Sequence, residues 1–302
     1  MNKITLDNEY EYREVYELEG INRNYIRIPR YIIINDEMQS HRVALFTYLS
    51  IYKGYDHDLY FTIPSILDWA GYANDARENG LNDKFINTLD YLNCDGYITY
   101  YKEPSRTGLC KVEFNMQQVF DECACGRFAI IYMDEIKRIM KYRNDNKKDT
   151  YLRNVNILLV FSYLRLMIPR RPNKLKIENR NPEGIAQRRE ALIEAYATNY
   201  KDIAEDIGLS AQTVAKAVKV LEKLKLIVVD ESFRIKKSDD SYFTPYTLFA
   251  NYEKRDGAYL VFSGLEYARS EMERKAEIIR RYNSSYCINT EKRTRREIMY
   301  YS

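Results

Sequence analysis

The segment from Asn199 to Ile227 combines residue types that can contact both base edges and phosphates. It reads NYKDIAEDIGLSAQTVAKAVKVLEKLKLI. A short apolar-faced stretch ends at Gly208, which favours the left-handed conformation that closes a helix. Ser210 can then cap a second, longer helix. That second helix has one apolar stripe, which we expect to be buried: Val214, Ala217, Val218, Leu221 and Leu224.

The opposite face of the predicted Ser210–Leu224 helix is small and polar at its start and basic further along. A helix that enters the major groove needs this distribution, because its first turns meet base edges while lysines reach phosphates. Gln212 can form two hydrogen bonds with adenine. The candidate contact residues on this helix are Ser210, Ala211, Gln212, Thr213, Lys216, Lys219 and Lys223.

A short hairpin is predicted to follow this helix. Its strands would be Leu226–Val229 and Phe233–Lys236, and its basic residues could touch an adjacent DNA backbone. These wing candidates are Arg234, Lys236 and Lys237.

The same succession of elements is predicted earlier in the chain. Periodicity and capping signals predict helices from Ser40 to Lys53, Ile66 to Ala70 and Leu81 to Asn93, a strand from Leu59 to Ile63, and a hairpin of 97–101 with 109–114. The second occurrence begins with an apolar helix from Tyr151 to Ile168. Aligning Gly96-Tyr97-Ile98 with Lys225-Leu226-Ile227 makes the two regions one unit used twice.

The first unit has a different outward face on its longer helix. Carboxylates there would oppose phosphate binding. Two interpretations stay open: this unit binds DNA through Lys84 and its wing residues Lys102, Arg106 and Lys111, or it serves as a dimerisation module. The predicted outward residues are Asn82, Asp83, Lys84, Asn87, Asp90 and Tyr91.

The second unit contains an insertion, residues 169–198, with a predicted helix from Pro182 to Ala197. Basic residues in and just before it form either a phosphate-binding loop or a solvated surface. They are Arg165, Arg170, Arg171, Lys174, Lys176, Arg180, Arg188 and Arg189. Beyond Ser238 we expect a C-terminal extension with a charged helix from Gly264 to Asn283 and a basic tail.

Composition restricts the remaining function classes. The chain has 47 basic and 44 acidic residues, so any DNA-binding charge must be local. With two histidines, His41 and His57, no phosphate-binding loop motif and irregularly spaced cysteines, we expect no enzyme, no metal site and no cofactor. The absence of a signal peptide or a long apolar run predicts a cytoplasmic protein without membrane contact.

The segment from Tyr200 to Lys237 resembles the winged helix-turn-helix superfamily in the style of many bacterial regulators. Two such units, the first opened by Tyr25-Ile-Arg-Ile-Pro29, resemble replication initiators of plasmids and mobile elements in Gram-positive bacteria. This resemblance implies binding to repeated origin sites on double-stranded DNA, recruitment of host replisome proteins, and a homodimer as a candidate assembly.

We therefore expect a mainly α fold with small β-hairpin wings, of α+β class, containing two winged helix-turn-helix units in tandem and a C-terminal helical extension. The expected parts are an arm (1–24), a first domain (25–120), a second domain (121–238) and the extension (239–302). Two other functions stay open: a transcriptional regulator at one palindromic operator, and a protein-interaction scaffold that binds no DNA.

Overall fold

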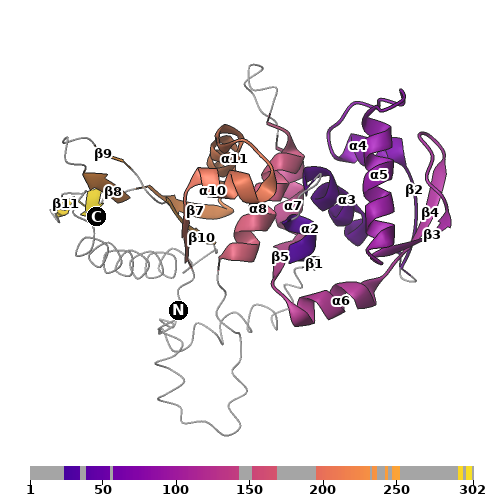
Figure 1. Cartoon of the computed structure of the whole chain (residues 1–302), viewed down its shortest axis with the longest axis horizontal. Helices are drawn as coiled ribbons and strands as arrows, with labels where there is room; N and C mark the ends of the chain where they lie inside the picture. The colour runs from indigo at the N-terminus through magenta and orange to yellow at the C-terminus, as the bar shows by residue number, and fades with distance from the viewer. Residues whose placement is uncertain are drawn as a thin grey trace, which may run out of the picture. The chain divides into compact units, whose positions relative to one another are not determined.

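The computed structural model describes residues 24–34, 39–54, 57–142, 152–168, 195–231, 233–236, 242–243, 247–251, 292–294 and 297–300. The fold is α+β, with small sheets, as Figure 1 shows. The chain divides into two compact bodies. We call residues 24–166 with 200–224 the helical body, and residues 1–23, 167–199 and 225–302 the strand-rich body.

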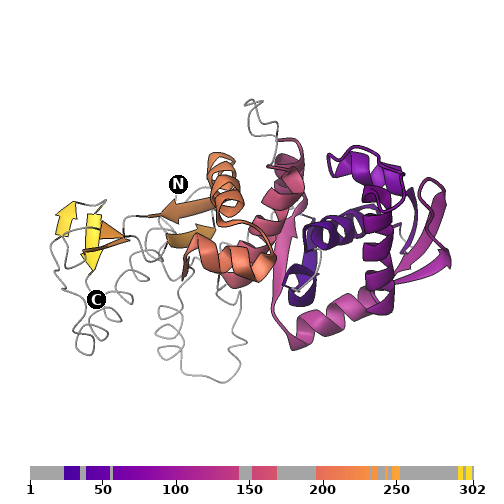
Figure 2. The ribbon, with the colours of Figure 1, turned by 45° about the horizontal axis from the view of Figure 1, so that its top comes forward.

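The helical body contains a unit, here called the first repeat, that follows the predicted order of elements. Its sheet has the strand order β2-β4-β3, and both pairings are antiparallel. In Figures 1 and 2 its three helices lie on one side of that sheet. The elements are α3 (Gln39–Tyr52), β2 (Asp58–Thr62), α4 (Ile63–Trp69), α5 (Leu81–Cys94), β3 (Ile98–Lys102) and β4 (Leu109–Phe114).

Local sequence explains where these elements begin and end. The Thr62 side chain accepts a hydrogen bond from the Ser65 amide and so caps α4, with Pro64 in its first turn. Gly96, with a φ of 77°, ends the turn after α5 in the left-handed region. The core of the first repeat is aromatic: Phe46 lies 5.6 Å from Tyr97 and 5.4 Å from Phe114, between ring centroids.

A second part of the helical body was not predicted from the sequence. Strand β1 (Tyr25–Pro29) pairs antiparallel with β5 (Phe128–Tyr132), so two segments about a hundred residues apart in the chain form one small sheet. Helix α6 contacts β1, and α7 contacts β5. The helices are α2 (Arg30–Ile33), α6 (Met116–Cys125) and α7 (Met133–Met140).

The helices of the second repeat also lie in the helical body. They are α8 (Asn154–Met167), α10 (Tyr200–Ile207) and α11 (Ala211–Lys223), which match the three predicted helices closely. Residues 157–166 of α8 are all buried, including the polar Ser162 and Arg165. This helix is therefore a core element.

The strand-rich body contains two sheets. The first has the order β6-β10-β7, all antiparallel, from β6 (Ala195–Thr198), β7 (Ile227–Asp230) and β10 (Thr247–Asn251). The second has the order β11-β12-β8-β9, from β8 (Phe233–Lys236), β9 (Tyr242–Phe243), β11 (Lys292–Thr294) and β12 (Glu297–Tyr300). Strand β12 runs parallel to β8.

Two sequence predictions about this region are wrong. Strand β7 does not pair with β8 but with β10, so the predicted hairpin of 226–229 with 233–236 does not form. The end of the predicted Pro182–Ala197 helix is instead strand β6, held by its ladder with β10. In each case long-range pairing, which a local pattern does not contain, decides the structure. After residue 238 the described residues form the strands β9 to β12, while the expected helix of the extension, Gly264 to Asn283, lies outside the described residues.

Several predicted features lie outside the described residues. They are the N-terminal arm up to residue 23, the inserted Arg170, Arg171 and Lys174, the rest of the predicted insertion helix, Lys237, and the charged helix from Gly264 to Asn283.

Candidate nucleic-acid interface

The turn between α10 and α11 is built as the sequence predicted. Gly208 has a φ of 63°, and the Leu209 amide donates to the Ala204 carbonyl at 3.0 Å. Ser210 caps α11, because its Oγ accepts a hydrogen bond from the Thr213 amide at 3.1 Å. The Ser210 and Thr213 hydroxyls are also 2.8 Å apart. Both hydroxyls thus hold the start of the helix in place.

One side of α11 is fixed in the core of the helical body. Val214, Ala217, Val218 and Leu221 are all buried, together with Ile203 and Ile207 of α10. The Tyr163 hydroxyl of α8 donates to the Asp206 carboxylate at 2.5 Å, which ties the end of α10 to the same core. These contacts fix which face of α11 points outward.

The outward face of α11 carries a row of four polar or basic residues. Gln212, Lys219 and Lys223 are exposed, and Lys216 is half-buried. Their spacing of four, three and four residues places them along one stripe of the helix. Ala211 is exposed and Ala215 half-buried, so small side chains separate this stripe from its neighbours. The arrangement lets a helix approach a groove closely while its lysines reach phosphates.

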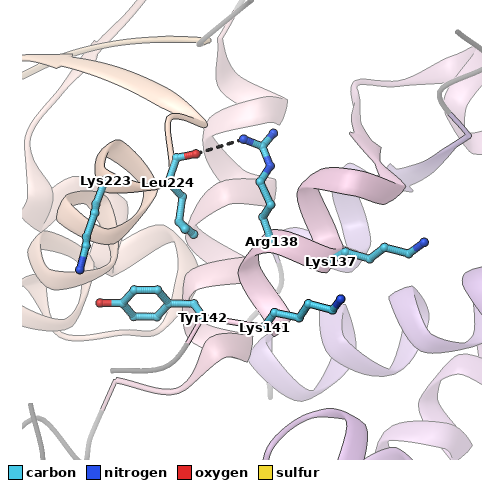
Figure 3. Close-up of a pocket in the computed structure, with 6 residues that line it drawn as sticks. All are labelled: Lys137, Arg138, Lys141, Tyr142, Lys223 and Leu224. Atoms are coloured by element: carbon cyan, nitrogen blue, oxygen red, sulfur yellow. Dashed lines mark hydrogen bonds between the residues drawn. The ribbon is translucent and has the colours of Figure 1, made fainter. Parts of the chain in front are cut away.

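Lys223 lies at the end of this row, beside α7. Its Nζ is 5.7 Å from the centroid of the Tyr142 ring, a cation–π distance. One residue on, the Leu224 carbonyl accepts a hydrogen bond from Arg138 Nη1 at 3.1 Å (Figure 3). Arg138, Lys137 and Lys141 were not among the predicted candidates. Their signal was present as the run of basic residues in IKRIMKYR, within a strongly amphipathic segment.

Two of the predicted basic contacts of the first repeat are paired with carboxylates. Arg106 forms two hydrogen bonds with Asp83, at 2.6 and 2.8 Å. This guanidinium holds the pKa of the Asp83 carboxyl below its usual value. Lys111 pairs with Asp58 at 2.7 Å and lies near the rings of Tyr60 and Tyr101.

Two other predicted contacts of the first repeat remain exposed. Lys84 and Lys102 are on the surface of α5 and β3. Asn82, predicted to face outward, is fully buried instead. Its side chain accepts from the Asp75 amide at 3.0 Å and donates to the Arg106 carbonyl at 2.7 Å. It therefore joins α5 to the loop before it and to the turn between β3 and β4.

The prediction that Arg165 is part of a basic, phosphate-binding surface is wrong. Arg165 is buried in α8 and donates to Glu135 Oε1 at 2.5 Å, with side chains 4% and 3% exposed. Glu135 Oε2 also accepts from the Tyr132 amide at 3.0 Å. The predicted wing residues Arg234 and Lys236 are on β8, which belongs to a different sheet from β7.

In the part of the chain that the structure describes, no three or more His, Cys, Asp or Glu side chains gather as metal ligands would. Within the same ranges, every helix is too short or too polar to cross a bilayer. No protein-family model matches the chain, and no curated protein sequence matches it significantly.

Proposed function

We propose that this chain binds double-stranded DNA with α11 and is a replication initiator of a plasmid or mobile element. The observation that carries the proposal is the row Gln212, Lys216, Lys219 and Lys223 on a helix whose opposite side is locked in the core. A capped helix with a small, polar first turn and lysines further along suits the major groove.

Strand topology supports two winged helix-turn-helix units. In the first repeat a strand (β2) precedes two helices, and the strands after them give the order β2-β4-β3. In the second repeat β6 precedes α10 and α11, and the order is β6-β10-β7. The first and last strands along the chain are neighbours in each case. The wing of the second unit would then be the connection between β7 and β10, with β8 and β9 in it.

The initiator role rests on this duplication and on the Tyr25–Pro29 opening that precedes it. It implies several equivalent DNA sites, host replisome proteins as partners, and a second copy of the chain bound nearby. A transcriptional regulator would use a single palindromic site overlapping a promoter.

Footprinting on the DNA that flanks the gene tests the role. An initiator protects an array of evenly spaced sites, and deletion of those sites abolishes plasmid maintenance. Protection of one promoter palindrome would replace the initiator by a regulator.

DNA binding is tested by fluorescence anisotropy with two duplexes, one that the chain protects in the footprint and one of scrambled sequence. Gln212→Ala should relax the preference for adenine at one position, by about 1–3 kcal/mol. Asn87→Ala, which removes an exposed uncharged amide from α5, is the matched control. A wild-type chain that binds no duplex would contradict the proposal.

A further inference from the structure

Helix α7 and the end of α11 together form a cationic hollow within the helical body. It is lined by Lys137, Arg138, Lys141, Tyr142, Lys223 and Leu224, with a volume of about 550 Å³. Ile136 and Ile139 bury the other side of α7, which leaves Lys137 and Lys141 exposed. Arg138 bridges the two helices through the Leu224 carbonyl and so fixes their separation (Figure 3).

The charges around this hollow are unbalanced. Asp134 pairs with Arg138 at 3.4 Å, and Glu222 is exposed beside Lys223. Among the described residues, Lys137, Lys141 and Lys223 have no carboxylate oxygen within 4.0 Å. Because these three lysines lack acidic partners within the described ranges, this part of the surface favours an anionic ligand.

The shape of the hollow favours a backbone over a small anion. Figure 3 shows Lys223 on one side of it and Lys137 and Lys141 projecting on the other. Their ammonium groups therefore form a strip instead of converging on a single point. The strip continues into Lys219, which lies one turn before Lys223 on α11. Spaced cations on an open surface suit successive phosphates of a nucleic acid strand.

We infer that Lys137 and Lys141 of α7, with Lys223, bind the phosphodiester backbone of the duplex next to the groove that α11 enters. This inference rests on the proposed function and extends the DNA-binding surface to a helix that precedes the second repeat. Arg138 is a positioning residue here, because it sets where α7 lies relative to α11.

The test is the salt dependence of duplex binding by the full chain, measured by fluorescence anisotropy. The double variant Lys137→Ala/Lys141→Ala should lower the slope of log K against log salt by about two units, at roughly 0.9 per phosphate contact. The loss of affinity should be the same for the protected fragment and for a scrambled duplex, because phosphates carry no sequence information.

The control is Arg30→Ala/Arg127→Ala, which removes two exposed positive charges from another surface of the same body. Urea unfolding should show all variants folded, since exposed substitutions usually change stability by less than about 0.5 kcal/mol. An equal change of slope in the α7 variant and the control would overturn the inference. So would an unchanged slope in the α7 variant alongside a lowered slope in Lys219→Ala, a result that leaves the proposed function standing. If the wild-type chain binds no duplex, both proposals fail.

Discussion

Helices α5 and α11 occupy the same place in the element order of the two repeats, yet their outer faces differ. On α5 the two carboxylates bind neighbouring side chains: Asp83 pairs with Arg106, and Asp90 accepts a hydrogen bond from the Tyr100 hydroxyl at 3.0 Å. On α11 the exposed row is basic. Similar topology therefore gives different surfaces, and function has to be argued from the surface.

The repeats also differ in how each first helix buries an arginine. Arg165 of α8 is paired with Glu135. Arg42 of α3 is 2% exposed and lies beneath the rings of Tyr31 and Tyr91, at 5.4 and 5.6 Å. Within the described residues, its Nε and Nη1 have no hydrogen-bond partner. Arg165 also lies 4.9 Å from the centroid of the Phe161 ring, so the ion pair with a carboxylate is what distinguishes it from Arg42.

The largest effect is expected from breaking the pair in α8. Glu135→Gln would leave Arg165 buried without a charged partner, which should cost about 3–5 kcal/mol in the free energy of unfolding. The matched change near Arg42, Asp95→Asn, should cost much less, because no ion pair joins Asp95 to Arg42 within 4.0 Å. Urea unfolding measures both. Equal losses of unfolding free energy in the two variants would show that a carboxylate stabilises both buried arginines to the same extent.

Lowering the pH should reduce the stability of the first repeat. Burial, followed by the charges of Lys84 and Arg153, lowers the pKa of His41 from its ordinary value of 6.5 to about 4. Between these values the unfolded chain binds a proton that the folded chain does not. The free energy of unfolding should fall as pH is lowered through this window, by about 3 kcal/mol at most.

His41→Gln should remove this component. Urea unfolding of the wild type and of the variant at pH 7 and pH 5 measures how much unfolding free energy each protein loses. The wild type should lose more stability than the variant between these two values. Identical losses would mean that His41 titrates alike in both states.

The turns after α5 and α11 allow a reciprocal exchange. Gly96 has a φ of 77° and Lys225 a φ of 54°, at the positions aligned from the sequence. A Cβ at Gly96 would meet nothing within 4 Å, so Gly96→Ala should cost about 1 kcal/mol from backbone strain alone. Lys225→Gly should stabilise the chain by up to about 1 kcal/mol. Thermal unfolding would contradict the alignment if both changes had the same sign.

The smallest effect is expected from releasing Arg106. Asp83→Asn removes the carboxylate that pairs with this guanidinium. Binding to a scrambled duplex should strengthen slightly, with a salt slope steeper by one unit at most. Weaker binding by this variant would mean that Asp83 supports DNA contact instead of opposing it.

Local signals predicted the helices of both repeats well, because each has its own caps and apolar stripe. Gly208 and Ser210 place the turn and the cap before α11 without any tertiary information. The outward position of Lys219 follows from the buried stripe opposite it.

What the sequence did not predict depends on distant partners. The β1–β5 sheet joins segments far apart in the chain, and β7 pairs with β10 across an intervening segment that contains β8. Asn82 was assigned outward by helix periodicity but is buried by hydrogen bonds to two loops. Arg165 was counted as a surface cation because Glu135 is remote in sequence.

The comparison of α5 with α11 is tested most directly by removing one exposed lysine from each. Salt-dependent anisotropy on a protected duplex should show that Lys219→Ala lowers the slope of log K by about one unit, while Lys84→Ala leaves it unchanged. A lowered slope in Lys84→Ala with none in Lys219→Ala would contradict the account, because the first repeat would then be the part that contacts DNA.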